Sequence, residues 1–163
     1  TNHDETMWDA PPPALFDGQE GAQAAFVLAT SMHGVPLVYS GQELGVEDTV
    51  SFFARTPYEW ADADGPVTEF YRDYLALYRD SPALRNGELE VLTPDAEDAL
   101  LYRRSTGEDE VLVAVNVRST EQSIELPARF EAGELETVLG GTSPEGTTLN
   151  LEPYGIRILQ GGV

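Results

Sequence analysis

The chain has 163 residues, no cysteine and a formal net charge of -20, from 29 acidic and 9 basic residues. A disulfide framework and thiol chemistry are therefore excluded. Such a negative surface repels phosphate groups, so we expect neither nucleic acid nor a membrane surface as a partner. No apolar run reaches the length of a membrane span, and no signal peptide is recognised. Because Thr1 is not a natural initiator, we expect the true N-terminus to lie upstream.

The acidic excess has its own pattern. All nine basic residues are arginine, and the acidic residues are spread along the whole chain and form no tail. Acidic surfaces without lysine are typical of proteins that work at high salt, where screening removes the self-repulsion. We therefore favour a halophilic, salt-adapted source.

Two helices and one strand are expected before residue 87. Asp17 reads as the N-cap of the first helix, with Glu20 completing a capping box, and Gly34 reads as its end. Residues 35–39 are apolar without alternation, which predicts a strand buried on both faces, as in a parallel barrel. Pro66 is a good first-turn residue for the second helix.

From Glu88 onward the hydrophobic period changes to two. Turn-rich pieces separate short strand candidates, which are residues 88–92, 99–104, 111–117, 122–126, 135–139, 148–151 and 155–159. Short strands at this spacing indicate an antiparallel sandwich. We place the boundary near residues 85–87, which gives an N-terminal part, 1–86, and a sandwich domain, 87–163.

Asn2, His3 and Asp4 form the first candidate site. In the functional interpretation, Asp4 holds the hydroxyls of a distorted sugar ring and favours a transition state in which positive charge develops. His3 would then hydrogen-bond a neighbouring hydroxyl. The alternative is an ordinary turn, since these residue types are common where chains leave strands.

The run 34–43, GVPLVYSGQE, is the second candidate. Tyr39 and Glu43 are expected at the rim of a substrate pocket, with Trp8 beside it; alternatively, the glycines serve only backbone geometry. The loop aromatics Phe52, Phe53 and Trp60 either stack on sugars or form a satellite core. We expect no metal site, because no second histidine stands at ligand spacing from His3.

These segments resemble the alpha-amylase family of glycoside hydrolases. Asn2-His3-Asp4 is similar to the segment that carries the family's third catalytic carboxylate, and residues 34–43 are similar to its eighth-strand segment. Residues 70–87 resemble the last barrel helix and its exit, and residues 111–117 and 151–156 resemble the C-terminal sandwich. The resemblance implies an α/β part, the last elements of a (β/α)8 barrel, followed by an all-β antiparallel sandwich.

The same resemblance implies a function. The chain would be the C-terminal part of a retaining glycosidase that acts on alpha-linked glucans such as starch and maltooligosaccharides. Asp4 would be the transition-state stabiliser, with His3 and Asn2 binding substrate. The family's nucleophile and acid/base segments lie upstream of Thr1, so we expect the fragment alone to be inactive. Many members carry an arginine three positions after the aspartate; this chain has Met7 there, and we expect no chloride activation.

Two alternatives stay open. The first is a non-catalytic sandwich module that binds glucan or another protein. The second is a transglycosylase or isomerase of the same family. The expected partners are an alpha-glucan and either the missing N-terminal barrel portion or another copy of the chain. No cofactor is expected in this fragment, calcium remains open for the complete enzyme, and a periplasmic or extracellular location is favoured over a cytoplasmic one.

Overall fold

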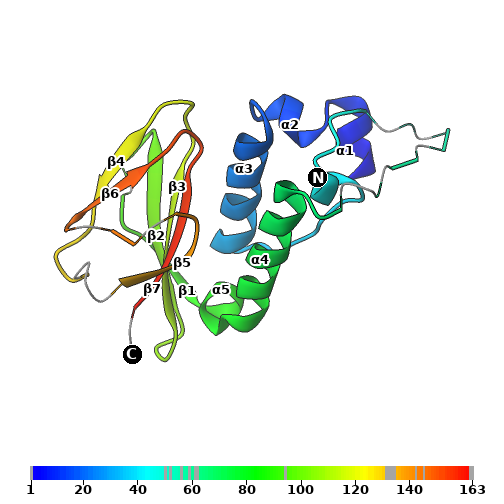
Figure 1. Ribbon diagram of the computed structural model, residues 1–163. Coiled ribbons are helices and arrows are strands. Elements are labelled where there is room, and N and C mark those ends of the chain that lie inside the picture. Colours follow the sequence, from blue (N-terminus) through cyan, green and yellow to red (C-terminus); the bar gives the residue numbers. More distant parts are fainter. Residues whose placement is uncertain are drawn as a thin grey trace.

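The computed structural model describes residues 2–49, 51, 53–55, 57–58, 60, 63–93, 95–130, 135–141, 143–144 and 146–161. Within these residues, helices occupy the N-terminal part and strands occupy the C-terminal part. Figure 1 shows α3 next to the main sheet, α4 beside α3, α2 at the upper end of α3, and α1 on the side of the helical part that lies away from the sheet.

The first three helices are α1 (His3–Trp8), α2 (Pro12–Leu15) and α3 (Gln19–Met32). The expected Asp17 cap is wrong, because Gly18 is the N-cap of α3, at φ 106°, and no side chain caps the helix. Asp17 itself has a left-handed backbone, and its Oδ2 accepts a hydrogen bond from Tyr154 Oη at 2.9 Å. Its carboxylate therefore bonds to the sheet domain and not to the helix.

The predicted strand at 35–39 is also wrong. The chain runs through this segment without strand pairing, and Val35 and Leu37 are 81% and 61% exposed. Val38, which points the other way, packs against the buried core. A strand needs a hydrogen-bonded neighbour, and no neighbouring strand lies beside this segment among the described residues.

The second helical stretch follows the prediction more closely. After the short 3-10 helix η1 (Gln42–Leu44), helix α4 spans Pro66–Asp80 and has its proline at the first turn, as expected. A short helix that the sequence analysis did not predict, α5 (Pro82–Asn86), follows at once. Ser81 ends α4 and caps α5, where its side chain accepts a hydrogen bond from Leu84 N at 3.2 Å.

All seven predicted strands are present. They are β1 (Glu88–Val91), β2 (Ala99–Ser105), β3 (Glu110–Asn116), β4 (Gln122–Glu125), β5 (Leu135–Leu139), β6 (Thr148–Leu151) and β7 (Ile156–Gly161). The main sheet has the order β1-β2-β3-β7-β5, and β4 pairs with β6 in a second sheet. Each pairing is antiparallel, which confirms the predicted antiparallel C-terminal architecture.

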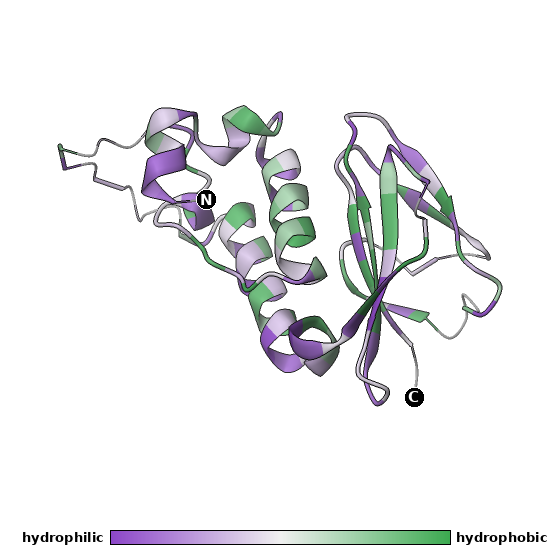
Figure 2. Ribbon diagram, turned by 180° about the vertical axis from the view of Figure 1, so that it is seen from behind, coloured by the Kyte–Doolittle hydropathy of each residue, from purple (hydrophilic) through white to green (hydrophobic). Residues whose placement is uncertain are grey.

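The main sheet is buried on both faces, so the described chain forms three layers. Alternate residues of β2 and β3, such as Tyr102 and Val113, pack with the helices in one core. Their neighbours, such as Leu101 and Leu112, pack against β4 and β6 in a second core. The period of two in the sequence produces this alternation. Helix α3, which is largely hydrophobic in Figure 2, supplies Phe26 and Val27 to the first core.

Two buried hydroxyl pairs join these layers. Thr30 Oγ1 of α3 lies 2.6 Å from Tyr74 Oη of α4, and Ser31 Oγ of α3 lies 2.5 Å from Tyr102 Oη of β2. Burial raises the pKa of Tyr74 to about 12, although the hydrogen bond from Thr30 opposes the shift. Each hydroxyl therefore stays protonated and has a partner, as buried polar groups require.

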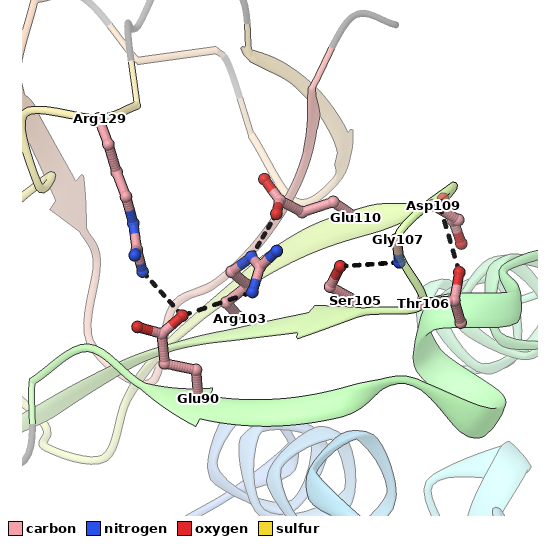
Figure 3. Close-up of polar contacts among 8 residues, drawn as sticks. All are labelled: Glu90, Arg103, Ser105, Thr106, Gly107, Asp109, Glu110 and Arg129. Atoms are coloured by element: carbon pink, nitrogen blue, oxygen red, sulfur yellow. Dashed lines mark hydrogen bonds and ion pairs between the residues drawn. The ribbon is translucent and has the colours of Figure 1, made fainter.

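Some of the arginines form ion pairs with glutamates of the main sheet. Glu90 of β1 lies 2.8 Å from Arg129 and 3.5 Å from Arg103 of β2, which also contacts Glu110 of β3 (Figure 3). Exposed pairs of this kind contribute little to the free energy of unfolding. With 29 acidic residues and only nine arginines in the sequence, most carboxylates cannot have an arginine of their own.

We expect salt to stabilise the chain. At a net charge of -20, repulsion between carboxylates opposes compaction, and the screening length falls to about 3 Å at molar ionic strength. Salt also weakens the ion pairs, but acidic residues outnumber arginines by 29 to 9, so the relief of repulsion should dominate. Thermal melts in low and molar potassium chloride test this, with sucrose as the uncharged control. A midpoint that does not rise with chloride would remove the argument for salt adaptation.

Candidate functional site

Asn2 organises the first candidate segment. Its Oδ1 accepts hydrogen bonds from the backbone N–H groups of Asp4, at 2.8 Å, and Glu5, at 3.3 Å. Asn2 is therefore the N-cap of α1, a role typical of asparagine. The alternative of an ordinary turn is wrong, because a helix begins at His3. Since the amide oxygen is used in the cap, a substrate contact by Asn2 would come from its Nδ2 group.

His3 and Asp4 occupy the first turn of α1. Their side chains are 61% and 65% exposed, and His3 Nε2 lies 3.4 Å from Asp4 Oδ1, a contact that is an ion pair when the imidazole is protonated. The Asp4 backbone is fixed by the cap, while its carboxylate lies at the surface. The Asp4 carboxylate therefore extends to the surface from a fixed backbone position.

A tight turn positions the second candidate segment. Gly41 adopts φ +90°, and a Cβ atom there would lie 2.6 Å from Tyr58 Cε1, so only glycine fits. The next residue, Gln42, accepts a hydrogen bond from Tyr39 N at 3.3 Å and donates one to Tyr71 Oη at 2.9 Å. Burial raises the pKa of Tyr71, so its hydroxyl stays protonated.

The two segments lie beside one another. A small hollow has Thr6 of α1 and Pro12 of α2 in its lining, together with Tyr39, Gly41 and Gln42 of the turn. Thr6 is 4% exposed, and its hydroxyl donates to Asn2 O at 2.9 Å. Thr6 and Gln42 were not predicted as site residues. Of the predicted rim residues, Tyr39 lies in this lining, whereas Trp8 and Glu43 lie outside it. The predicted catalytic and substrate-binding residues Asp4 and His3 also lie outside it.

The predicted aromatic residues have separate environments. Trp8, Phe53 and Trp60 are 78%, 98% and 58% exposed. Trp60 makes an edge contact with Tyr58, with ring centroids 6.4 Å apart, and Tyr58 covers Gly41. Trp60 is thereby linked to the turn. Phe52 lies outside the described residues.

An apolar groove runs along α3 next to the unpaired segment. Its lining includes Phe16, Ala25 and Ala29 together with the exposed Val35 and Leu37, and its volume is about 280 Å³. The groove and the segment 34–39 thus form one continuous apolar surface of the helical part.

Among the described residues, no three His, Asp or Glu side chains gather as a metal site would require. The described helices are all too short or too polar to cross a membrane. Glu43, the last predicted rim residue, is partly buried, and its Oε2 atom has no hydrogen-bond partner among the described residues.

The fold and the site define a mostly antiparallel sheet domain preceded by a helical part that carries the candidate residues. Residues 89–158 match the family described as Maltogenic Amylase, C-terminal domain. Alpha-amylase MalA of Haloarcula japonica is 30% identical over 141 residues, which cover 82% of this chain and 20% of that protein. Alpha-amylase 2 of Dictyoglomus thermophilum is 27% identical over 142 residues, which cover 79% of this chain and 24% of that protein.

Solved structures agree on the fold. The trehalulose synthase MutB from Pseudomonas mesoacidophila superposes with a TM-score of 0.70 at 20% identity, over 88% of this chain and 38% of that one. The recognition made from the sequence is therefore confirmed: the chain corresponds to the C-terminal region of alpha-amylase-family proteins. It spans only a fifth to a quarter of the length of the two curated relatives named above.

Proposed function

We propose that the chain is the C-terminal part of a retaining glycosidase that acts on alpha-linked glucans. The observation that carries the proposal is the extent of the sequence match. The family domain covers residues 89–158, but the alignments with the two amylases cover 79% and 82% of the chain and so must include much of the helical part. A sandwich module alone would match only the C-terminal half. The proposal therefore includes a catalytic role for the complete protein.

In this proposal, residues 1–86 are the last elements of a (β/α)8 barrel, and residues 87–163 are the sandwich. The unpaired segment 34–39 supports this division, because Val35 and Leu37 are exposed on an extended chain that lacks neighbouring strands in the described part. The eighth strand of a barrel would have this appearance without its neighbours. The missing N-terminal portion is then the expected occupant of the groove beside it.

The chemistry follows from one exposed carboxylate. Positive charge develops on the sugar in the transition state of glycoside hydrolysis, and a fixed negative group close to that carbon stabilises it. Asp4 is such a group, held at the start of α1 by the Asn2 cap. The side chain of His3 and the Nδ2 group of Asn2 would bind neighbouring hydroxyls of the sugar. The nucleophile and the general acid/base would come from upstream segments.

Transglycosylation or isomerisation by the same machinery remains the second candidate, because Asp4 would stabilise a similar transition state there. A non-catalytic glucan- or protein-binding module is the third. The sequence of the parent reading frame separates these classes: strand ends bearing an Asp and a Glu upstream of residue 1 support the enzyme, and their absence supports the module. Calcium binding would then be a question for the complete protein.

We expect the purified chain of 163 residues to hydrolyse neither starch nor maltooligosaccharides. A closed barrel needs eight strands and about 250 residues, and in this proposal the carboxylate pair required for retention is supplied by upstream segments. Reducing-sugar release, measured against the complete protein at equal concentration, tests this. Glucan hydrolysis that co-purifies with the chain and survives removal of contaminating amylase would contradict the proposal.

A further inference from the structure

Glu43 carries a buried carboxylate oxygen whose bonding is incomplete. Its Oε2 atom is shielded from solvent and has no hydrogen-bond partner within the described residues. Burying a carboxylate oxygen without a donor is unfavourable, more so than burying a neutral acceptor. Such a group is retained in a fold where a partner compensates it.

The backbone around Glu43 is held in place, so the buried oxygen is not the result of a loose surface side chain. Thr68 of α4 donates to Glu43 O at 2.7 Å. Gly41 and Gly45, on either side of η1, both adopt left-handed conformations. The neighbouring amide of Gln42 is already bonded to Tyr39 and Tyr71. The backbone position from which the Glu43 side chain extends is therefore fixed.

No donor within the described residues bonds to Glu43 Oε2. The ion pairs of Arg72, Arg118 and Arg157 lead to other carboxylates, and no ion pair of the described residues leads to Glu43. The sequence has no lysine that could replace them. The nearby phenols of Tyr58 and Tyr71 do not supply positive charge; burial, with a contribution from the negative charge of Glu43, raises the pKa of each.

We propose that Glu43 is the acceptor for an arginine side chain from the polypeptide that precedes residue 1 in the longer protein. A guanidinium group is suited to this role, because it donates two parallel hydrogen bonds to one carboxylate and stays charged when buried. The inference rests on the proposed function, since it requires an upstream portion. A second copy of the chain is a poor donor, because two bodies of charge -20 repel each other.

The test compares the same substitutions in the longer protein and in the 163-residue chain. In the longer protein, Glu43→Gln and Glu43→Ala should lower the thermal midpoint by several degrees and to a similar extent, because an uncharged amide leaves the arginine unpaired. In the chain alone, Glu43→Gln should leave the midpoint unchanged or raise it, because it removes an uncompensated charge. Glu47→Gln, at an exposed position in the same loop, is the matched control and should change neither midpoint.

Three results would overturn the inference. A Glu43→Gln variant of the longer protein that melts like the parent would mean that the partner is neutral or absent. A similar loss in both proteins would place the contact inside the chain itself. A parent reading frame without an upstream barrel would remove the donor together with the proposed function, and this is read from the sequence before any melt is recorded. The melting results thus test the role of Glu43, and the sequence of the parent reading frame tests the proposed function separately.

Discussion

Replacing Asp4 by Asn in the longer protein should lower kcat by about two to three orders of magnitude while the fold survives. Removing one preorganised group that stabilises transition-state charge commonly costs about 3–4 kcal/mol. The local structure does not depend on the Asp4 carboxylate, since the cap of α1 uses the Asp4 backbone N–H and the Asn2 side chain. The side chain itself is exposed and is paired only weakly with His3, at 3.4 Å.

Steady-state kinetics on maltooligosaccharides, with thermal melts of both proteins, provide the measurement. Asp9→Asn is the matched control, because Asp9 is an exposed carboxylate at the opposite end of α1. It should retain the parent kcat and midpoint. An Asp4→Asn variant with near-parent turnover would rule out the assignment of Asp4 as the transition-state stabiliser.

The strands could be predicted from the sequence because their signal is local. In β2 and β3, residues such as Leu101 and Tyr102 alternate between the two cores, and the alternation of side chains is written directly into the chain. The prediction of α4 succeeded for a similar reason, since Pro66 and an amphipathic stripe mark it.

Two of the failures involve interactions between distant residues. The segment 35–39 has the composition of a buried strand, but pairing depends on neighbours that the described chain does not offer. Asp17 is a residue type that is common at helix N-caps, yet its carboxylate accepts a hydrogen bond from Tyr154, which is 137 positions away in the chain. Local patterns cannot show which partner such a side chain selects.

The candidate site was predicted only in outline. The cap formed by Asn2 was not predicted, although an asparagine followed by two acidic residues in the next turn is a known helix start. Thr6 and Gln42 carried no comparable signal. Their positions in the hollow follow from the packing of α1 against the turn at Gly41, which only the three-dimensional structure shows.

The second large effect concerns Arg104, a buried cation whose hydrogen-bond partners in the described residues are backbone carbonyls. Arg104 of β2 is 2% exposed. Its Nη1 donates to the carbonyls of Ser31 and Met32 at the end of α3, and its Nη2 donates to Gly87 O at 2.8 Å. One guanidinium thus satisfies three carbonyls and joins the helical part to the sheet. The negative end of the α3 dipole compensates part of its charge.

Arg104→Met should therefore lower the free energy of unfolding by about 3 kcal/mol or more, because it leaves buried carbonyls without donors. For a chain of this size, that corresponds to a fall of about 6–12 °C in the thermal midpoint. The thermal midpoint of Arg104→Lys should lie between those of the parent and Arg104→Met. Its single ammonium group cannot replace the planar guanidinium that donates to both Met32 and Gly87.

The neighbouring arginine provides the control. Arg103 precedes Arg104 on β2 but points to the other face, where it contacts the partly exposed Glu90 and Glu110 (Figure 3). Arg103→Met removes the same charge and should lower the free energy of unfolding only slightly. Denaturant unfolding of the two variants compares them directly. Equal losses would show that net charge, and not the carbonyl contacts, sets the contribution of Arg104. A much larger loss for Arg104→Met would mean that the junction between helices and sheet depends on this one side chain.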